Sequence, residues 1–408
     1  MKTVDEALDA LARLTNYERT QPDGPRSLDL ERPRALLERL GSPHRHLGAR
    51  VIQVAGTKGK GSTVRFLDSI LQRAGLRTGR FLSPHLEHVR ERIAIDGAWI
   101  PEEEFARHVG TILDAVGSET TFFEAMLATA CLHFAEHETD AVVLEVGLGG
   151  RLDATTAVPT THNVITPIGL EHTRILGDTV EQIAFEKAGT IRYAVPVWTG
   201  VPPGSGPAQV LQQVALRQEA PLHFVAPPTD VVPAPDGLRW SDRFLRVLGR
   251  HQAHNAALAA ACCHDLPREA VDDGLMAAEQ PGCCEMRGAV MVDGAHTIES
   301  IAATIATLHD HRPGARPVLL FALARDKDLD RIAPLLAPHV QEVVCVRADP
   351  KRGRSPEELA AHPVWASRAQ SQPSVREGLE LALRLAGGPG LVLATGSVYL
   401  AGAVRPLA

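Results

Sequence analysis

Two lysines lie within a glycine-rich stretch that has the composition of a phosphate-binding loop. Its members are Gly56, Thr57, Lys58, Gly59, Lys60, Gly61 and Ser62. Glycines allow backbone N–H groups to curl around an anion, and each lysine adds a full positive charge. The strict pattern G-x-x-x-x-G-K-S/T is not met, because the glycines stand closer together and Gly61 separates Lys60 from Ser62. An ordinary turn is the alternative, but a turn gains nothing from clustered positive charge, so the residues favour a nucleotide loop.

The flanking pattern predicts the elements that would position this loop. Residues 51–55 form a short apolar run typical of a buried strand, and residues 63–74 have apolar positions on one helical face, with Gly75 as the expected C-terminal stop. A strand, a glycine-rich loop and a helix in this order place the helix N-terminus, with its positive dipole, against the phosphates.

Polar residues also follow three further predicted strands. Ser83 ends the strand expected at 77–83, Glu145 ends the apolar run 140–145, and His172 follows the strand expected at 163–168. Ligands of open α/β sheets bind at the carboxyl ends of the strands, where a carboxylate such as Glu145 can hold the magnesium of a nucleotide. A lone histidine at such a place is usually a surface residue, but its position in the same sheet makes His172 a candidate ligand of metal or phosphate.

For several charged residues, the sequence pattern does not decide between a functional role and simple exposure to solvent. Glu124, in the apolar helix predicted over 122–137, is either a helix-end residue in water or a buried functional acid. Arg32 and Arg34 either face solvent or meet an acidic ligand. Lys187 stands beside Glu186 in the helix expected around 180–190, and this spacing alone predicts a solvated surface charge.

Composition limits the class of protein. A chain of 408 residues with 44% apolar and 22% charged residues predicts a soluble protein of two or three domains, and a net charge of −7 argues against wholesale nucleic-acid binding. The first 20 residues predict an amphipathic helix rather than a signal peptide, and no apolar run reaches the ~18 residues of a membrane span. Without a CxxC spacing, we expect reduced thiols in a cytoplasmic protein at Cys131, Cys262, Cys263, Cys283, Cys284 and Cys345.

The C-terminal part predicts a second sheet. After a Pro/Gly-containing linker at 277–286, strands expected at 289–295, 318–324, 342–347, 364–367 and 391–395 alternate with helices expected at 298–310, 329–336, 356–361 and 375–385. A hairpin is expected earlier, at 238–247. Alternation of this kind implies parallel strands with right-handed crossovers, so the fold class is α/β with two sheets.

Taken together, the motifs resemble those of the folylpolyglutamate synthase/dihydrofolate synthase family, a branch of the Mur ligase superfamily. The resemblance runs from about residue 28 to the C-terminus. It rests on the order and spacing of GTKGKGS (56–62), SPHL (83–86), ERI (91–93), EVGLGGRLDAT (145–155), IGLEHT (168–173), LGDT (176–179), EKAG (186–189), HQ with Asn255 (251–255), DGAH (293–296) and DKD (326–328).

The resemblance implies an ATP-dependent amide ligase of folate and one-carbon metabolism. A pterin-linked carboxylate would attack the γ-phosphate of ATP, and the amine of L-glutamate would capture the resulting acyl phosphate. It implies a P-loop ATPase domain of the Mur ligase central type at 1–282 and a smaller Rossmann-like glutamate ligase domain at 287–408. ATP and Mg²⁺ are the expected cofactors, with K⁺ as a candidate addition, in a monomer that needs neither nucleic acid nor membrane. A crevice between the two sheets would hold ATP.

The resemblance also assigns roles by residue. Lys60 and the loop amides would hold the β- and γ-phosphates, with Asn255 and Asp293 on the nucleotide. Magnesium would be held by Ser62 or Ser83, Glu145 and His172, and Lys187 would be carbamylated. Arg32, Phe123, Glu124, Asp153, Ala154 and Thr155 would line the pterin site, and His296 would lie where glutamate binds.

The chain departs from the family pattern at several positions. Cys283 stands where family members usually have an arginine that contacts ATP phosphate, so Arg287 is its candidate substitute. Glu171, Thr156, Thr297, Ile298 and Lys58 are the other departures. They keep two alternatives open: an amino-acid ligase of the same superfamily that uses another carboxylate, and a nucleotide-binding relative with impaired catalysis.

Overall fold

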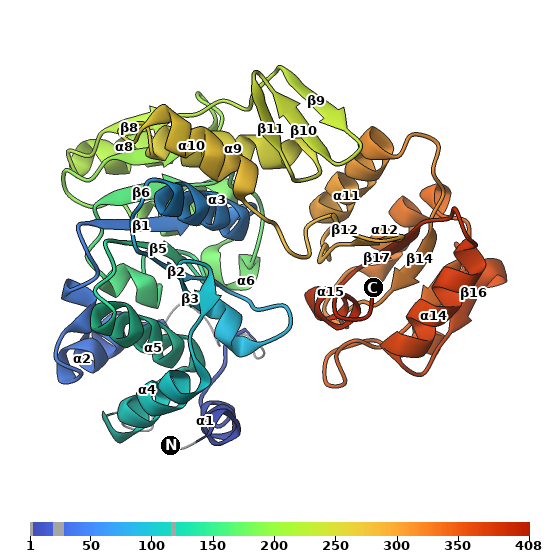
Figure 1. Cartoon of the computed structure of the whole chain (residues 1–408), viewed down its shortest axis with the longest axis horizontal. Helices are drawn as coiled ribbons and strands as arrows, with labels where there is room; N and C mark the ends of the chain where they lie inside the picture. The colour runs from blue at the N-terminus through green and yellow to red at the C-terminus, as the bar shows by residue number, and fades with distance from the viewer. Residues whose placement is uncertain (1–2, 19–27, 116–119) are drawn as a thin grey trace. The chain divides into compact units, whose positions relative to one another are not determined.

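The computed structural model describes residues 3–18, 28–115 and 120–408 (Figure 1). These residues form two compact units. Unit 1 draws on the described residues within 1–85, 89–228 and 254–277, and unit 2 on 86–88, 229–253 and 278–408. The predicted domain boundary between 282 and 287 stays a prediction. Over the described ranges, none of the helices has the length and apolar character needed to cross a membrane.

Unit 1 is organised around a sheet with the strand order β4-β3-β2-β5-β1-β6-β7-β8. The strands β2, β5, β1, β6, β7 and β8 pair in parallel, whereas β3 and β4 add an antiparallel edge. The bounds are β1 Arg50–Ala55, β2 Thr78–Phe81, β3 Ile93–Ile95, β4 Ala98–Trp99, β5 Ala141–Glu145, β6 His162–Ile165, β7 Val197–Thr199 and β8 Leu222–Phe224.

The register of this sheet brings the predicted site segments to one edge. Val54 of β1 pairs with Glu145 of β5, and Ala55 pairs with Ile165 of β6. All five residues of β5 are buried, as expected for a central parallel strand covered on both faces. The segments that follow β1, β5 and β6 therefore leave the sheet side by side.

Ten α-helices of the described chain accompany the strands of unit 1. They are α1 Val4–Leu11, α2 Glu31–Arg39, α3 Lys60–Arg73, α4 Glu102–Ala115, α5 Phe122–Glu136, α6 Thr173–Leu176, α7 Val180–Ala188, α8 Gly206–Arg217, α9 Arg250–Cys262, whose first residues belong to unit 2, and α10 Arg268–Ala277. The apolar face of α5 packs into a core with the inner strands (Figure 1).

Unit 2 contains a small antiparallel sheet and a larger mixed one. The small sheet has the order β11-β10-β9, and the larger has the order β12-β13-β17-β14-β15-β16, in which β12 is the antiparallel edge. The bounds are β9 Val231–Ala234, β10 Gly237–Trp240, β11 Arg243–Leu245, β12 Glu285–Arg287, β13 Val290–Val292, β14 Val318–Phe321, β15 Val343–Cys345, β16 Ala369–Ser371 and β17 Val392–Thr395. Its helices are α11 Ile298–His311, α12 Leu329–Leu336, α13 Pro356–Ala360, α14 Val375–Ala386 and α15 Val398–Val404.

The predicted α/β fold class is confirmed, and so is the hairpin, which is formed by β10 and β11. The strand predicted at 364–367 is wrong. Trp365 is buried there, where its Nε1 donates to the Leu359 carbonyl at 2.9 Å, and the strand begins only at Ala369. The N-terminal helix is shorter than predicted, since α1 ends at Leu11, and residues 1–2 and 19–20 of that prediction lie outside the described residues. The six cysteines, all within the described ranges, are thiols that are not joined in disulfides.

Candidate active site

The predicted phosphate loop connects β1 to α3. Gly59 is the N-cap of α3 and has φ of +86°, a conformation that side chains other than glycine's rarely adopt. A Cβ at this position would lie 2.3 Å from Oδ1 of Asn255, so the loop passes close to that side chain. Backbone N–H groups at the start of α3 lack helical partners, which makes this turn suited to an anion.

Both loop lysines have defined partners. The Nζ of Lys60 donates to the carbonyls of Gly56 at 3.3 Å and Thr57 at 3.4 Å, so this side chain folds back over its own loop. The Nζ of Lys58 lies 3.2 Å from Oε1 of Glu171. Two cations are thus concentrated at the carboxyl edge of the sheet.

Lys187 is buried, and the surface charge expected from its helical spacing is wrong. Only 2% of the residue is exposed, and its Nζ donates to the Gly56 carbonyl at 2.6 Å. Burial and repulsion from Lys60 lower the pKa of Lys187 to about 7. The reason for its burial is tertiary: the end of α7 packs on the Gly149–Asp153 turn, where the Arg151 N–H donates to the Glu186 carbonyl at 2.7 Å.

Glu145 lies at the end of β5 beside the loop. It is 4% exposed, its Oε2 accepts a hydrogen bond from the Ser83 N–H at 3.0 Å, and burial raises its pKa to about 7 against the attraction of Lys60. The same oxygen lies 3.4 Å from the Cβ that a residue other than glycine would have at position 61. Glu145, Ser83 and the first turn of α3, which carries Ser62, are therefore brought together.

Glu171 was not predicted to take part in the site, although it was noticed as a departure from the family pattern. Burial, the largest single influence, raises its pKa, but the combined attraction of Lys60, Lys58, His172 and Lys187 outweighs it and lowers the pKa to about 2. Its segment is tied to the loop, because Thr57 Oγ1 contacts both the N–H and the carbonyl of Gly169 at 3.1 Å. His172 follows as the N-cap of α6, with φ of +49°. A polar pair a few residues after a predicted strand was the signal available in the sequence.

The residues at this edge fit a divalent cation and a triphosphate. Buried carboxylates are stabilised by a cation, and the raised pKa of Glu145 shows that its charge is incompletely balanced by protein groups. The loop amides, Lys58 and Lys60 supply the complementary positive field for phosphates.

The first group of residues predicted to line the pterin site lies at the start of α5. Glu124 accepts hydrogen bonds from Arg32 at 3.1 and 3.3 Å, and its other oxygen accepts the Thr121 N–H in a capping box. Glu124 therefore lies at a helix end but is buried and ion-paired, so the alternative in water is wrong, and a functional role of this acid stays a prediction. Phe123 packs on Phe81, with ring centroids 5.5 Å apart.

Asp153, Ala154 and Thr155 form a buried turn. The Asp153 carboxylate accepts the N–H groups of Gly147, Leu148 and Thr155 at 2.9–3.0 Å, together with the Thr155 hydroxyl at 2.5 Å. The Thr155 Oγ1 in turn accepts from Gln53 Nε2 at 2.9 Å. This geometry fixes the glycine-rich segment after β5, and the pterin role of these three residues stays a prediction.

In unit 2, Asp293 organises the turn that follows β13. Its carboxylate accepts the N–H groups of Cys284 and Ala295 at 2.8 Å, the Thr304 hydroxyl at 2.9 Å and the Cys284 thiol at 3.3 Å. His296 donates from Nδ1 to the Gly294 carbonyl at 2.8 Å, since a carbonyl can only accept.

Arg287, the candidate substitute for the missing arginine, lies on β12. Its Nε donates to Glu285 Oε1 at 2.8 Å, and Glu285 also pairs with Arg405. The Cys283 N–H donates to the Gln280 carbonyl at 3.1 Å. A role of Arg287 toward ATP stays a prediction.

Comparison with known proteins now gives the family. Residues 283–398 match the model of the Mur ligase glutamate ligase domain. A dihydrofolate synthase/folylpolyglutamate synthase of Bacillus subtilis is 36% identical over 73% of this chain and 76% of its own length. The chain belongs to the folylpolyglutamate synthase/dihydrofolate synthase family.

Some relatives in this family are considerably longer. A probable bifunctional folylpolyglutamate synthase/dihydropteroate synthase of Haloferax volcanii is 33% identical over 91% of this chain, but the chain spans only 47% of that protein's length. The matched part of that relative is therefore one portion of a larger polypeptide.

Solved structures of the family match along the whole chain. The folylpolyglutamate synthase of Mycobacterium tuberculosis complexed with ADP has a TM-score of 0.88 at 31% identity and covers 99% of this chain and 98% of its own. The bifunctional folylpolyglutamate synthase/dihydrofolate synthase of Yersinia pestis, complexed with AMPPNP and Mn ion, has a TM-score of 0.82 at 30% identity over 100% of this chain and 98% of its own. The first of these relatives thus binds ADP, and the second binds AMPPNP and a Mn ion.

Proposed function

We propose that this chain is an ATP-dependent acid–amino acid ligase that adds L-glutamate to a pterin-linked carboxylate, either dihydropteroate or a tetrahydrofolate polyglutamate. One arrangement carries the proposal: the loop with Lys60, the buried Glu145 and the buried Lys187 converge at the carboxyl edge of one sheet. Family membership and the glutamate ligase match support the amide-forming chemistry.

The chemistry needs this concentration of charge. A carboxylate is a poor electrophile at neutral pH, and it approaches a polyanion only where positive charge screens both. An oxygen of the substrate carboxylate attacks the γ-phosphorus of ATP. The bond between the γ-phosphorus and the β–γ bridging oxygen breaks, and ADP leaves. The glutamate amine then attacks the acyl carbon, loses a proton and expels phosphate, which leaves the amide.

The loop residues have distinct parts in this sequence. Lys60 and the N–H groups at the start of α3 would hold the β- and γ-phosphates, with Asn255 beside the loop. Glu145, Ser62 or Ser83 and His172 would hold Mg²⁺, which neutralises charge developing on the phosphates when bound. From unit 2, Asp293 and Arg287 would take part in binding ATP, and His296 would lie where glutamate binds. The pterin would be bound by Arg32, Phe123, Glu124 and the 153–155 turn.

Lys187 is the residue we propose to be carbamylated. A neutral amine adds to CO₂ and releases one proton, and a pKa of about 7 leaves much of the amine neutral at physiological pH. The same positive field of Lys60 and Lys58 that disfavours the ammonium would favour the carbamate anion. Labelling with ¹³C-bicarbonate and carbon NMR of the protein would test this, because Lys187→Arg should remove the carbamate resonance.

The remaining assignments are proposals too. We propose a monomeric cytoplasmic protein that uses Mg²⁺, with K⁺ as an activator, and that acts without nucleic acid or membrane. The domain division at 282–287 and the crevice between the two sheets belong to the same proposal. Sedimentation of the purified chain checks that it is a monomer, and activity assays with and without K⁺ check that K⁺ is an activator.

The deciding experiment measures product. The purified chain is incubated with ATP, Mg²⁺ and L-glutamate and either dihydropteroate or tetrahydrofolate, and glutamylated product and ADP are measured together. We expect stoichiometric product and ADP with at least one of the two. ADP release with neither would reject folate substrates, and ligation of glutamate to another carboxylate would favour the related amino-acid ligase. Nucleotide binding without turnover on any carboxylate would indicate the impaired relative.

A further inference from the structure

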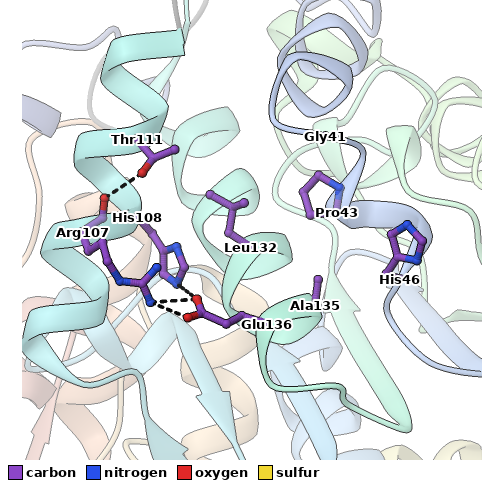
Figure 2. A pocket seen from close by; sticks show the side chains of 9 residues that line it. All are labelled: Gly41, Pro43, His46, Arg107, His108, Thr111, Leu132, Ala135 and Glu136. Atoms are coloured by element: carbon purple, nitrogen blue, oxygen red, sulfur yellow. Dashed lines mark hydrogen bonds and ion pairs between the residues drawn. The ribbon is translucent and has the colours of Figure 1, made fainter.

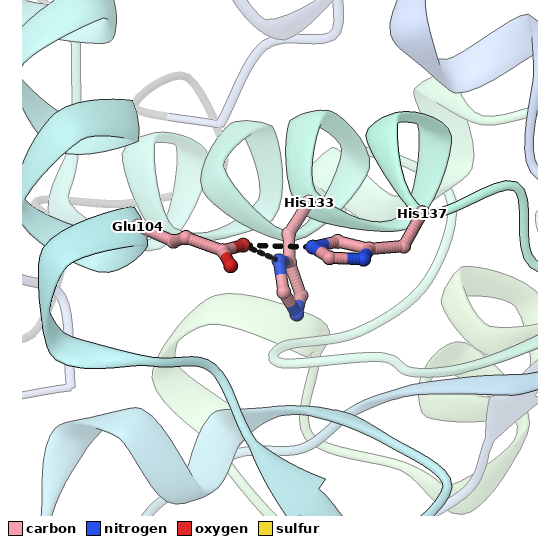
Figure 3. Close-up of side chains that lie close together, drawn as sticks. All are labelled: Glu104, His133 and His137. Atoms are coloured by element: carbon pink, nitrogen blue, oxygen red, sulfur yellow. Dashed lines mark hydrogen bonds and ion pairs between the residues drawn. The ribbon is translucent and has the colours of Figure 1, made fainter.

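A second group of ligand-type side chains lies in unit 1 on α4 and α5, outside the loop site. Glu104 comes from the first turn of α4, whereas His133 and His137 lie one turn apart at the C-terminal end of α5. One oxygen of Glu104 and one ring nitrogen from each histidine all lie within 4.8 Å of one another. Figure 3 shows the carboxylate facing both imidazoles. Within the described ranges, this is the group of histidine, cysteine or acidic side chains in which three ligand atoms lie this close together.

The distances suit a shared cation. Oε2 of Glu104 lies 3.0 Å from His133 Nδ1 and 2.8 Å from His137 Nε2. Two ligands held about 2.0–2.1 Å from a tetrahedral Zn²⁺ lie about 3.3 Å apart. A small rotation of the side chains would therefore admit the metal between atoms that already converge.

The buried nitrogen of His133 is not satisfied as an ordinary hydrogen-bonding group. His133 is 3% exposed, and its Nδ1 makes no hydrogen bond within the described part of the chain, although Glu104 Oε2 is close. A buried polar atom without a hydrogen bond is costly. Coordination to a metal would remove this cost, because a cation lying along the Nδ1 lone pair would give this buried atom a partner.

Two features of the surroundings favour a cation, whereas the Arg77 guanidinium near His137 opposes it. The last carbonyls of α5 point toward its C-terminal end, where His137 is the C-cap, and Glu104 adds a full negative charge. On the neighbouring stretch of the same helix pair, Glu136 pairs with Arg107 at 2.7 Å and lies 3.2 Å from His108 Nε2 (Figure 2). The His108 and His133 rings have centroids 6.2 Å apart.

A surface pocket lies beside the Glu136–Arg107–His108 group, and its lining does not include the three proposed ligands. It is lined by Gly41, Pro43, His46, Arg107, His108, Thr111, Leu132, Ala135 and Glu136 (Figure 2). The Glu104 and His137 side chains are 26% and 30% exposed, so a hydrated ion can reach them.

We propose that Glu104, His133 and His137 form a Zn²⁺ site, completed by water, that joins α4 to α5. The donor set decides the metal. Two imidazoles and one carboxylate suit Zn²⁺, whereas Mg²⁺ prefers oxygen ligands. The site is separate from the proposed ligase chemistry and does not depend on it.

Arg77 gives the proposal a second, specific consequence. Its Nη2 lies 3.3 Å from His137 Nδ1, so without metal Nδ1 accepts and Nε2 carries the proton toward Glu104. If zinc binds Nε2 of His137, the ring proton must move to Nδ1. The Nδ1–H group would then face an N–H donor of Arg77, which is unfavourable. Removing the guanidinium should therefore strengthen zinc binding.

The test is a zinc titration of the full chain, stripped with a chelator and held in excess Mg²⁺ to occupy the loop site. A chromophoric chelator competes for Zn²⁺. We expect one Zn²⁺ per chain, binding about 100-fold more weakly in His137→Ala and in Glu104→Gln. Arg77→Gln should bind several-fold more tightly. Wild type and Glu145→Gln should bind alike, since Glu145 belongs to the loop site.

The control variant is His309→Ala, which removes an exposed histidine from the His309–His339 pair of unit 2 and should leave the zinc affinity unchanged. Circular dichroism verifies folding of each variant, and Co²⁺ in place of Zn²⁺ should give a tetrahedral visible spectrum in wild type that His137→Ala lacks. Equal zinc affinity of wild type and His137→Ala, or zinc binding lost only in Glu145→Gln, would overturn the proposal.

Discussion

Glu145 and Asp293 occupy the same kind of place, one in each unit, yet their surroundings differ. Both end or follow a parallel strand and both are buried. Asp293 accepts three strong hydrogen bonds, from two N–H groups and a hydroxyl, and a weaker one from the Cys284 thiol. Glu145 accepts the Ser83 N–H, and burial raises its pKa to about 7.

This difference separates two roles that the sequence could not separate. A carboxylate whose oxygens are occupied by its own turn holds that turn in shape, so Asp293 is suited to a part in nucleotide binding that acts through the position of its turn. A buried carboxylate with a raised pKa is destabilising on its own and gains from a cation, so Glu145 is suited to a metal-bound nucleotide. Four substitutions test this contrast.

The largest effect is expected from the loop lysine beside Glu145. Lys60→Ala removes a cation from the developing charge on the γ-phosphate and should lower kcat/KM for ATP by about 10³-fold. ADP release at saturating glutamate measures it. The control is Lys351→Ala, an exposed lysine of unit 2, which should retain wild-type turnover. Turnover of Lys60→Ala within tenfold of wild type would place the phosphates elsewhere.

Glu145→Gln should abolish metal-dependent turnover while making the folded chain more stable. The folded pKa of about 7 exceeds the ordinary 4.5, so the folded state binds more protons between these values and wild-type stability falls as pH rises from about 4.5 to 7. Above pH 7 the cost approaches about 3 kcal/mol. Glutamine removes this slope, and it can still accept the Ser83 N–H.

Urea unfolding of wild type and Glu145→Gln without nucleotide or metal, at pH 5 and pH 8, gives the measurement. We expect the variant to gain stability over wild type at pH 8 and little at pH 5. An equal difference at both pH values would mean that Glu145 does not titrate in this range.

Gly59→Ala should damage the loop more than an equivalent change outside it. Alanine at φ of +86° costs about 1 kcal/mol, and its Cβ would also meet Asn255 Oδ1 at 2.3 Å. Gly75→Ala is the matched control, with φ of +80° but open space around the Cβ. Calorimetric ATP binding should weaken at least tenfold in Gly59→Ala only. Equal weakening in both would indicate a general loss of stability.

The smallest effect is expected at the Asp293 turn. Thr304→Val removes one of the hydrogen bonds to Asp293 and should lower the free energy of unfolding of unit 2 by about 1 kcal/mol, with KM for ATP nearly unchanged. Ser241→Ala removes an exposed hydrogen bond to Asp230 elsewhere in unit 2 and serves as the control. A large rise in KM for Thr304→Val alone would give Asp293 a direct part in binding.

Much of this arrangement could be predicted from the sequence, and the exceptions have physical causes. The loop, Glu145 and the alternation in unit 2 follow from local spacing, because strand ends and glycine turns are local features. Lys187 could not be predicted from its helical period, since its burial comes from packing of α7 on the turn after β5. The strand predicted around Trp365 is wrong because this residue is in a local turn, where its indole N–H donates to the Leu359 carbonyl, and its ring packs on Phe321, which is distant in sequence.

The histidine cluster on α4 and α5 was also missed. His133 and His137 share one helical face by spacing, but the partner carboxylate of Glu104 lies about 30 residues away, so only the packing of the two helices reveals the group.

The most direct test of the ligase account follows an oxygen atom. The pterin carboxylate is prepared with heavy oxygen, the reaction is run with ATP and L-glutamate, and the released phosphate is examined by mass spectrometry. Transfer through an acyl phosphate predicts one heavy oxygen in each phosphate released, at the same rate as amide formation. Amide product with unlabelled phosphate would contradict the account.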